Sequence, residues 1–374
     1  LVLSGGGAKG LVHIGVIEMM DSLGIRPGLV VGTSMGAIIG ALYASGYSGK
    51  QIDSLARSLP LSDIFRSFEP AAPRSFEFLQ PLLYWAQGEH GFNLQRSAAS
   101  TAEANAITNN LALRGNLIAR GNFDSLPIPF RAIATNLADR SLVVIGTGDL
   151  ARALRASYAI PLIFPPEKIG GQLLGDGGLV ANVPVGVARK LGATRVIVSD
   201  ATAGVADSVG LDAPLALASH LVAFLFHQPS DSLGLSDALV RTKLAGVPDF
   251  EVSDRGVEKL VEAGRDAARK ALTASGCTAA PVANRTVPTH LDGFHVQGRS
   301  DGARSELRSL LGFAHTDTVN VKTLAERLRR LASSERFAAV WLNPHGADDS
   351  VSFELTVQRQ APRTGGIGLA YDQE

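Results

Sequence analysis

Gly32-Thr33-Ser34-Met35-Gly36 is the stretch that decides the fold, because of the residues on either side of it. An apolar run, Leu29–Val31, precedes it, and a second one, Ala37–Leu42, follows it. A buried strand, a turn too tight for side chains at its flanking glycines and then a helix make a nucleophile elbow. The pattern predicts a serine hydroxyl lifted clear of the backbone, with the amides of a helix N-terminus directed at charge developing nearby.

A glycine loop precedes the elbow. Leu1–Ser4 reads as a first strand, and Gly5–Gly10 as a loop that opens onto a helix and brings bare N–H groups close to an anion. The loop also satisfies G-x-G-x-x-G, but a dinucleotide site needs an acidic residue at the end of the next strand. That strand ends in Gly32-Thr33-Ser34. The glycines are therefore better explained as an oxyanion hole.

A serine nucleophile needs a base, and the histidines offer no constrained candidate. None of the eight lies in a glycine-rich setting, and His13 reads as a packed or partly exposed helix residue. The more pointed candidate is Asp176, which stands between the apolar Leu173-Leu174 and the glycines Gly177-Gly178. A structural aspartate in a turn is the alternative reading of that position.

With these motifs in this order, the chain resembles the patatin-like phospholipase family. The resemblance extends from Leu1 to about residue 275. The matching segments are Ser4–Gly10, Gly32–Gly36, Asp176–Gly178, and Ala156–Pro161 ahead of Phe164–Pro166.

The resemblance implies a three-layer α/β/α hydrolase domain that cleaves acyl esters of lipids, with membrane phospholipids as substrates and no metal or cofactor. It implies Ser34 as nucleophile and Asp176 as base of a Ser-Asp dyad. Oxyanion amides would come from the glycine loop, at Gly5, Gly6 and Gly7. Further glycines support the motifs, at Gly10, Gly32, Gly36, Gly177 and Gly178.

Elementary chemistry supports such a dyad independently. Serine is a weak nucleophile until a neighbour takes its proton, and a carboxylate within hydrogen-bond reach can take it and return it to the leaving alcohol. The oxyanion hole carries a large share of the stabilisation, so a modest base suffices. The elbow also comes after one or two strands, whereas an ordinary α/β-hydrolase places it after several.

Composition bounds the remaining possibilities. A length of 374 residues suggests two domains, and 45% hydrophobic residues with 40 glycines fit a packed α/β core. The balance of 35 basic and 35 acidic residues gives no net field to attract nucleic acid. The single cysteine, Cys277, forms no intrachain disulfide and leaves the redox compartment open.

Three apolar or aromatic segments have more than one reading. Residues 28–49 carry no charge and are long enough for a membrane span, but the elbow divides them into a buried strand and helix. Residues 213–228 read as a core helix or a lipid-facing lip. The aromatic residues 64–92 read as a packed insertion or as an acyl-chain channel or lid.

The rest of the first domain alternates strands and helices. Strands are expected at 128–135, 141–145 and 194–200, with helices such as 185–191 between them. This order predicts a mostly parallel sheet covered on both faces. The first domain is assigned to residues 1–277.

After Cys277 the composition changes. Residues 278–291 read as a linker, and 292–360 as a small α+β domain with the order β-α-α-β-β. That order resembles a POTRA module. Residues 361–374 alternate apolar residues with glycine and alanine, as the first strand of a membrane β-barrel does. A disordered tail is the alternative for this segment.

Hydrolase, POTRA module and barrel in this order resemble the patatin-type outer-membrane autotransporters of Gram-negative bacteria. The resemblance implies that the natural chain continues beyond Glu374 into a barrel in the outer membrane. The hydrolase domain would face the periplasm or be displayed at the cell surface or secreted, and a homodimer is compatible with the architecture. Two functions stay open: a lipid acyl hydrolase, or a catalytically idle platform for membrane or protein interactions.

Overall fold

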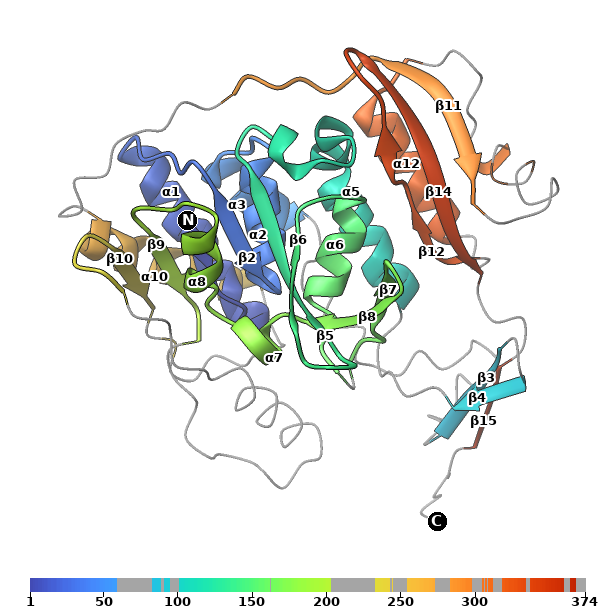
Figure 1. Cartoon of the computed structure of the whole chain (residues 1–374), viewed down its shortest axis with the longest axis horizontal. Helices are drawn as coiled ribbons and strands as arrows, with labels where there is room; N and C mark the ends of the chain where they lie inside the picture. The colour runs from blue at the N-terminus through green and yellow to red at the C-terminus, as the bar shows by residue number, and fades with distance from the viewer. Residues whose placement is uncertain are drawn as a thin grey trace.

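A mixed eight-stranded sheet forms the centre of the N-terminal part of the chain (Figure 1). The computed structural model describes residues 1–58, 83–88, 91–94, 101–161, 163–202, 233–242, 244, 254–272, 283–297, 305, 307, 309–311, 318–333, 337–359 and 364–367. In sheet order the strands are β10 (Ala238–Arg241), β9 (Ile197–Asp200), β1 (Val2–Leu3), β2 (Val30–Thr33), β5 (Phe130–Asn136), β8 (Gln172–Asp176) and β7 (Glu167–Ile169), and β6 (Leu142–Ile145) also pairs with β5.

The sheet has a parallel part and an antiparallel part. β10, β9, β1, β2 and β5 run parallel to their neighbours. β6 and β8 run antiparallel to β5, and β7 runs antiparallel to β8. The parallel part agrees with the sequence prediction, whereas the direction of β6 and β8 adds a mixed region that the strand pattern alone does not give.

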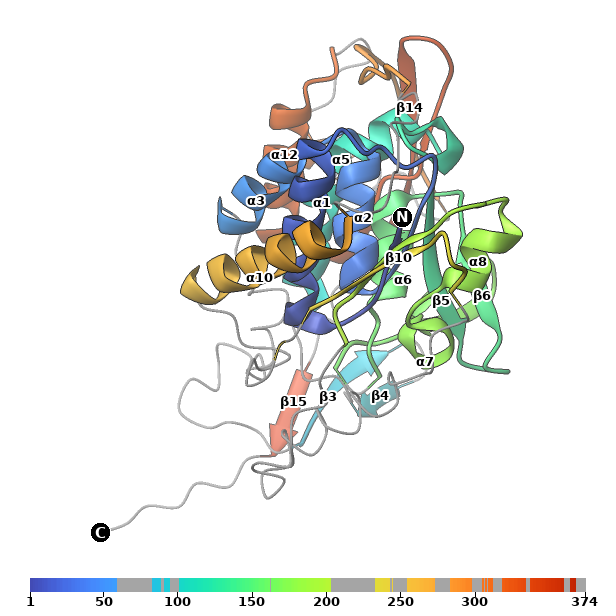
Figure 2. The ribbon, with the colours of Figure 1, turned by 90° about the vertical axis from the view of Figure 1, so that its left-hand side faces the viewer.

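Helices cover both faces of this sheet, as Figure 2 shows for α1, α2 and α10 on one side and α8 on the other. The larger layer consists of α1 (Val12–Ser22), α2 (Met35–Ala44), α3 (Gly49–Ser58), α5 (Thr101–Ala119), α6 (Leu150–Ser157) and α10 (Asp254–Leu272). The thinner layer includes α8 (Val185–Lys190), whose Val185, Val187 and Ala188 pack on Val2, Val31 and Val198 of the sheet. The predicted α/β class is confirmed.

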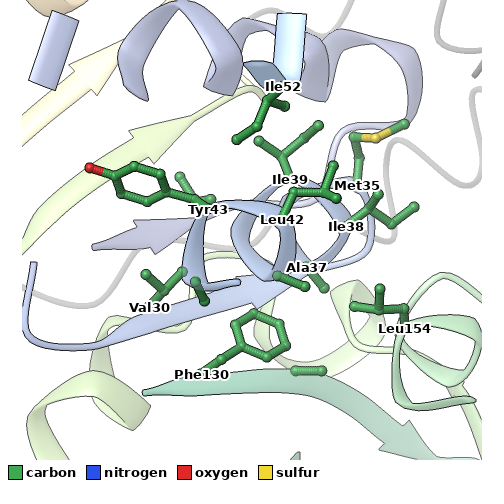
Figure 3. Packing of buried hydrophobic residues seen from close by; sticks show 14 of the residues in the cluster. Val30, Met35, Ala37, Ile38, Ile39, Leu42, Tyr43, Ile52, Phe130 and Leu154 are labelled. Carbon is green, nitrogen blue, oxygen red and sulfur yellow. The ribbon is translucent and has the colours of Figure 1, made fainter. Parts of the chain in front are cut away.

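Helix α2 lies in the middle of the core. All ten of its residues are buried, which is the expected environment for a helix that is apolar on every side. Figure 3 shows Ile39 and Leu42 directed toward Ile52 of α3, while Ala37 lies on the side of Phe130 of β5. Residues 30–45 are thus core, and the uncharged segment 28–49 is divided into a strand and a helix as predicted. Among the described residues, no helix is long and apolar enough to cross a membrane.

Helices α1 and α10 meet at two glycines that allow their backbones to touch. A Cβ placed on Gly15 of α1 would lie 1.9 Å from the Val261 carbonyl oxygen. A Cβ on Gly264 of α10 would lie 2.0 Å from the Val12 carbonyl oxygen. Neither position has room for a side chain, so the two helices cannot keep this separation with any other residue there.

We expect Gly15→Ala to lower the free energy of unfolding by roughly 2–3 kcal/mol, because the methyl group forces α1 and α10 apart. Helix propensity acts in the opposite direction, since alanine is favoured over glycine by about 1 kcal/mol inside a helix. Guanidinium denaturation measures the difference. Gly28→Ala is the matched control, because its Cβ would meet nothing within 4 Å. A Gly15→Ala variant as stable as the Gly28→Ala protein would contradict the close crossing.

The C-terminal part of the chain forms a second, smaller sheet with its own core. Its strands are β11 (His290–Val296), β12 (Phe337–Trp341), β13 (Pro344–His345) and β14 (Ser350–Arg359), in the order β11-β14-β12, with β13 also on β14. β11 runs parallel to β14, and β12 antiparallel to it. Helix α12 (Val321–Ser333) packs on this sheet, and Leu307 and Leu311 add a further helical segment to its core.

Helix α5 carries the contact between the two parts, and Figure 1 shows α12 and β12 beside it. Leu113 and Leu117 of α5 belong to the C-terminal core, and Trp341 belongs to the core of the first domain. The Asn109 side chain donates to the Val340 carbonyl at 3.1 Å. Asp149, the N-cap of α6, accepts from the Leu342 N–H. The second sheet is therefore joined to α6 by a buried hydrogen bond.

A third, small sheet joins two distant segments. β15 (Thr364–Ile367) pairs antiparallel with β3 (Leu83–Gly88), which pairs with β4 (Gly91–Leu94). The glycine-rich segment near Gly365 thus forms a strand beside β3 within this chain. Most of the aromatic segment 64–92, and all of 213–228, lie outside the described residues, so their readings stay predictions.

Candidate active site

Ser34 occupies a strained turn between β2 and α2. Its backbone angles are φ 54° and ψ −122°, a conformation that non-glycine residues rarely adopt. The flanking glycines are required by close approach: a Cβ on Gly32 would lie 2.4 Å from the Gly36 carbonyl oxygen, and one on Gly36 would lie 2.4 Å from the Ser4 carbonyl oxygen. This is the geometry of a nucleophile elbow.

Asp176 ends β8 next to the elbow and is fully buried. Its Oδ1 accepts a hydrogen bond of 2.7 Å from the Gly178 N–H, at the start of α7 (Gly178–Ala181). Burial raises the pKa of the carboxyl to about 7, while the Gly178 N–H and the Ser34 hydroxyl act in the opposite direction as donors. The structure thus brings Ser34 and Asp176 together.

The Ser34 hydroxyl is close enough to Asp176 to act on the pKa of its carboxyl. Within the described ranges, Oδ2 of Asp176 has no hydrogen-bond partner. Catalytic hydrogen bonds in free enzymes are often long and tighten when substrate binds. Ser34 itself is 1% exposed.

Ser157, at the end of α6, connects both members of the pair. Its Oγ accepts a hydrogen bond of 3.0 Å from the Ser34 N–H and donates one of 2.6 Å to the Ile133 carbonyl. Its carbonyl oxygen accepts from the Gly177 N–H at 3.2 Å. One residue therefore holds the elbow, strand β5 and the turn after Asp176 in fixed relation.

The glycine loop passes beside the elbow and leads into the short helix η1 (Gly7–Leu11). Gly7 has a φ of 53°, in the left-handed region that favours glycine. The Ser4 hydroxyl anchors the loop by donating to the Gly5 carbonyl and accepting from the Ala201 N–H, each at 2.9 Å. The Gly5 N–H, one of the three predicted oxyanion donors, donates to Asn182 Oδ1 at 3.1 Å.

A second serine also has a close polar partner, and its setting is structural. The Ser199 Oγ lies 2.7 Å from His13 Nδ1, and His13 Nε2 lies 2.9 Å from the Ser4 carbonyl oxygen. Burial lowers the pKa of His13 to about 4, although the Ser4 carbonyl and the charge of Asp200 oppose it. A neutral imidazole therefore donates to Ser4 and ties α1 to β1 and β9.

No three His, Cys, Asp or Glu side chains gather as a metal site would require in the part of the chain that the structure describes. A small cavity lies at the seam between α5 and the C-terminal sheet. Its lining includes Asn105, Asn109 and Val340 and none of the residues around Ser34.

Comparison with known proteins identifies the family of the half of the chain that holds this site. The model of the patatin-like phospholipase family matches residues 1–189, half of the chain. The chain belongs to this family. The match includes the elbow, Asp176 and Ser157, and it ends before the C-terminal sheet begins. The POTRA resemblance of that sheet stays a prediction.

Patatin-like relatives share the first half of the chain. An uncharacterized NTE family protein of Mycobacterium tuberculosis is 32% identical over 188 residues, which is 50% of this chain and 44% of that protein. The human patatin-like phospholipase domain-containing protein 6 is 31% identical over 202 residues, 54% of this chain and 13% of that protein. This patatin-like chain thus spans less than half the length of these relatives.

Among solved structures, VipD from Legionella pneumophila matches with a TM-score of 0.43 and 14% identity, over 71% of this chain and 65% of that one. The type III effector protein ExoU matches with a TM-score of 0.36 and 15% identity, over 72% of this chain and 51% of that one.

Two residues of this patatin-like site had no assigned role from sequence. Ser157 stood in a matching segment, but its contacts with both Ser34 and Gly177 follow only from the fold. In the sequence, Asn182 stands two positions before Pro184, at the start of a helix. Its position six residues after Asp176 is the signal that could have pointed to it. Its burial and its hydrogen bond with Gly5 follow only from the fold.

Proposed function

We propose that the chain is a lipid acyl hydrolase of the phospholipase A type, in which Ser34 is the nucleophile and Asp176 the base. The observation that carries the proposal is the meeting of a strained serine with a buried carboxyl whose pKa is raised to about 7. Membership of the patatin-like phospholipase family supplies the substrate class. An ordinary structural turn requires neither the strain nor the elevated pKa.

The proposed reaction has two steps. Ser34 Oγ attacks the ester carbonyl carbon while the Asp176 carboxylate takes the hydroxyl proton, and an oxyanion forms on the carbonyl oxygen. Collapse of this tetrahedral intermediate breaks the bond to the alcohol, which leaves with the proton from Asp176. Water then attacks the acyl-Ser34 ester in the same way and releases the fatty acid. The raised pKa of Asp176 makes it a stronger base than an exposed aspartate.

Product analysis tests this proposal directly. Phospholipids with different acyl chains at the two positions are incubated with the protein, and mass spectrometry identifies the released fatty acid and lysophospholipid. We expect a free fatty acid and a lysolipid in equal amounts from the wild-type protein and neither from Ser34→Ala. Absence of both products with the wild-type protein, under conditions in which the protein is folded, would favour the idle interaction platform.

We further propose that residues 290–359 form a POTRA-like module and that the protein works at the outer membrane. The β-α-α-β-β order and the sheet order β11-β14-β12 support the first part. The alternation of apolar residues with glycine and alanine near Gly365 supports the second part, and these residues are already in strand conformation beside β3. Fractionation of cells that express the native gene tests the location, with heat-modifiable mobility on gels expected for a barrel. Recovery of the native product entirely from the cytosol would contradict it.

A further inference from the structure

A buried side-chain amide lies beside the elbow, and its N–H₂ group has no hydrogen-bond partner among the described residues. Asn182 follows α7 and is 2% exposed. Its Oδ1 accepts the Gly5 N–H at 3.1 Å, and because that N–H is a donor, the oxygen must be the atom that faces it. Nδ2 is therefore on the other arm, and it has no hydrogen-bond partner within the residues that the structure describes.

This amide is a direct neighbour of Ser34. A Cβ placed on Gly5 would lie 2.6 Å from Asn182 Oδ1, 3.7 Å from Asn182 Cγ and 3.2 Å from Ser34 Cβ, so both side chains crowd the same point on the loop. The chain segments around them are also joined. The Thr33 hydroxyl, one residue before Ser34, donates at 3.0 Å to the carbonyl of Ala181, one residue before Asn182.

An unmet donor in this place has a chemical meaning. Leaving a buried N–H group without an acceptor is unfavourable, so folded proteins rarely keep one unless water, a ligand or a reacting group satisfies it. The other unmet atom of the site, Asp176 Oδ2, is an acceptor. The two side chains next to Ser34 thus have one unpartnered acceptor, on Asp176, of the kind that a serine proton requires, and one unpartnered donor, on Asn182, of the kind that negative charge on an ester oxygen requires.

We propose that Asn182 Nδ2 donates a hydrogen bond to the oxyanion that forms when Ser34 attacks the ester, which makes Asn182 a catalytic residue. The inference rests on the proposed acyl hydrolase function. Gly5 then acts as a positioning residue, because its N–H holds Asn182 Oδ1 and leaves Nδ2 directed elsewhere. The amides of Gly6 and Gly7 stay the predicted backbone donors, and the Asn182 side chain takes the place expected for the Gly5 amide.

Asn182→Asp separates these roles. The variant keeps an oxygen for the Gly5 N–H but replaces the donor with a second oxygen. We expect kcat to fall by about 10²–10³-fold with little change in KM, as for loss of one oxyanion donor. Rates are compared on the plateau of each pH profile, so that a changed pKa of Asp176 does not enter. Asn122→Asp, an exposed N-cap whose oxygen accepts the Asp124 N–H, is the matched control and retains full activity.

A transition-state mimic distinguishes catalysis from structure. A long-chain trifluoromethyl ketone forms a tetrahedral oxyanion on Ser34, whereas an ether analogue of the substrate binds without reacting. We expect Asn182→Asp to weaken the binding of the ketone by the same factor by which it lowers kcat/KM. The affinity for the ether should stay unchanged. Equal weakening of both ligands, or an unchanged kcat in the folded variant, would overturn the inference.

The wild-type protein provides a test that does not depend on the folding of a variant. In a crystal structure of the adduct between Ser34 and an alkyl fluorophosphonate, we expect the phosphonyl oxygen at about 2.7–3.1 Å from Asn182 Nδ2. An adduct whose oxygen lies beyond hydrogen-bond reach of Nδ2 would refute the role of Asn182 and leave the hydrolase standing. Failure of Ser34 to form an adduct would refute the proposed function itself.

Discussion

Replacing Ser34 with alanine is expected to reduce the rate of ester hydrolysis by about 10⁴-fold or more, equivalent to roughly 5 kcal/mol of lost transition-state stabilisation. The reason is that no acyl-enzyme can form, so the remaining rate comes from substrate binding and the oxyanion donors alone. Release of fatty acid from a phospholipid measures the rate. A fluorophosphonate should label the wild-type protein at Ser34 and leave Ser34→Ala unlabelled. Near-normal esterase activity in Ser34→Ala would show that the nucleophile lies elsewhere.

The backbone at Ser34 provides an independent control on this result. Alanine keeps the strain of a φ of 54°, whereas glycine relieves it. We expect Ser34→Gly to be about 1 kcal/mol more stable than Ser34→Ala, although glycine usually costs conformational entropy. Ser141→Ala, at an exposed serine outside the site, should leave activity unchanged and remove only the hydrogen bond from its Oγ to Asp139. If Ser34→Gly were the less stable variant, the elbow would not be strained.

Features that depend on residues close together in the chain could be predicted from the sequence. The elbow is one of them, because the glycines on both sides of Ser34 and the apolar runs around them lie within about one strand and one helix. Asp176 was only a candidate on local grounds, because a carboxyl between an apolar strand and two glycines also fits a structural aspartate in a turn. Their meeting across β2, β5 and β8 was implied by the family resemblance rather than by spacing.

Features that depend on contacts between distant segments could not be predicted. Gly15 and Gly264 each interrupt a helix in sequence, and nothing local shows that they face one another. The antiparallel direction of β8 also has no signature, because side chains alternate in the same way in either direction. On α5, Asn105 and Asn109 resemble a solvated face, yet both are buried at the seam with the C-terminal sheet.

Asp176→Asn is expected to abolish hydrolysis to nearly the same extent as Ser34→Ala, because an amide cannot accept the serine proton. In the wild-type protein the base must be ionised, so the rate should rise with pH through about 7, the pKa to which burial raises this carboxyl. Measurement of kcat/KM from pH 5 to 9 checks this. The rise of kcat/KM with pH should persist when each histidine is replaced in turn. If replacing one histidine removed this rise, that histidine would be the base or part of it, and the site would be a triad rather than a dyad.

The same substitution is expected to increase stability above neutral pH. The pKa of Asp176 is higher in the folded state than in the unfolded chain, so its contribution to stability is fully present below about pH 3.8 and is lost as the pH rises through about 7. At pH 8 the ionised carboxyl therefore costs the folded state about 4 kcal/mol at most. Asparagine avoids this cost, because it stays neutral and keeps an oxygen for the Gly178 N–H.

Denaturation of both proteins at pH 5 and at pH 8 isolates this effect, since all other titrating groups are common to the two proteins. We expect the stability advantage of Asp176→Asn to be larger at pH 8 than at pH 5, alongside its loss of activity. A carboxyl that merely caps a turn would give the reverse, because its ionised form would be the stabilising one. A variant less stable than the wild-type protein at pH 8 would thus support the structural reading of Asp176 and remove the base from the proposed dyad.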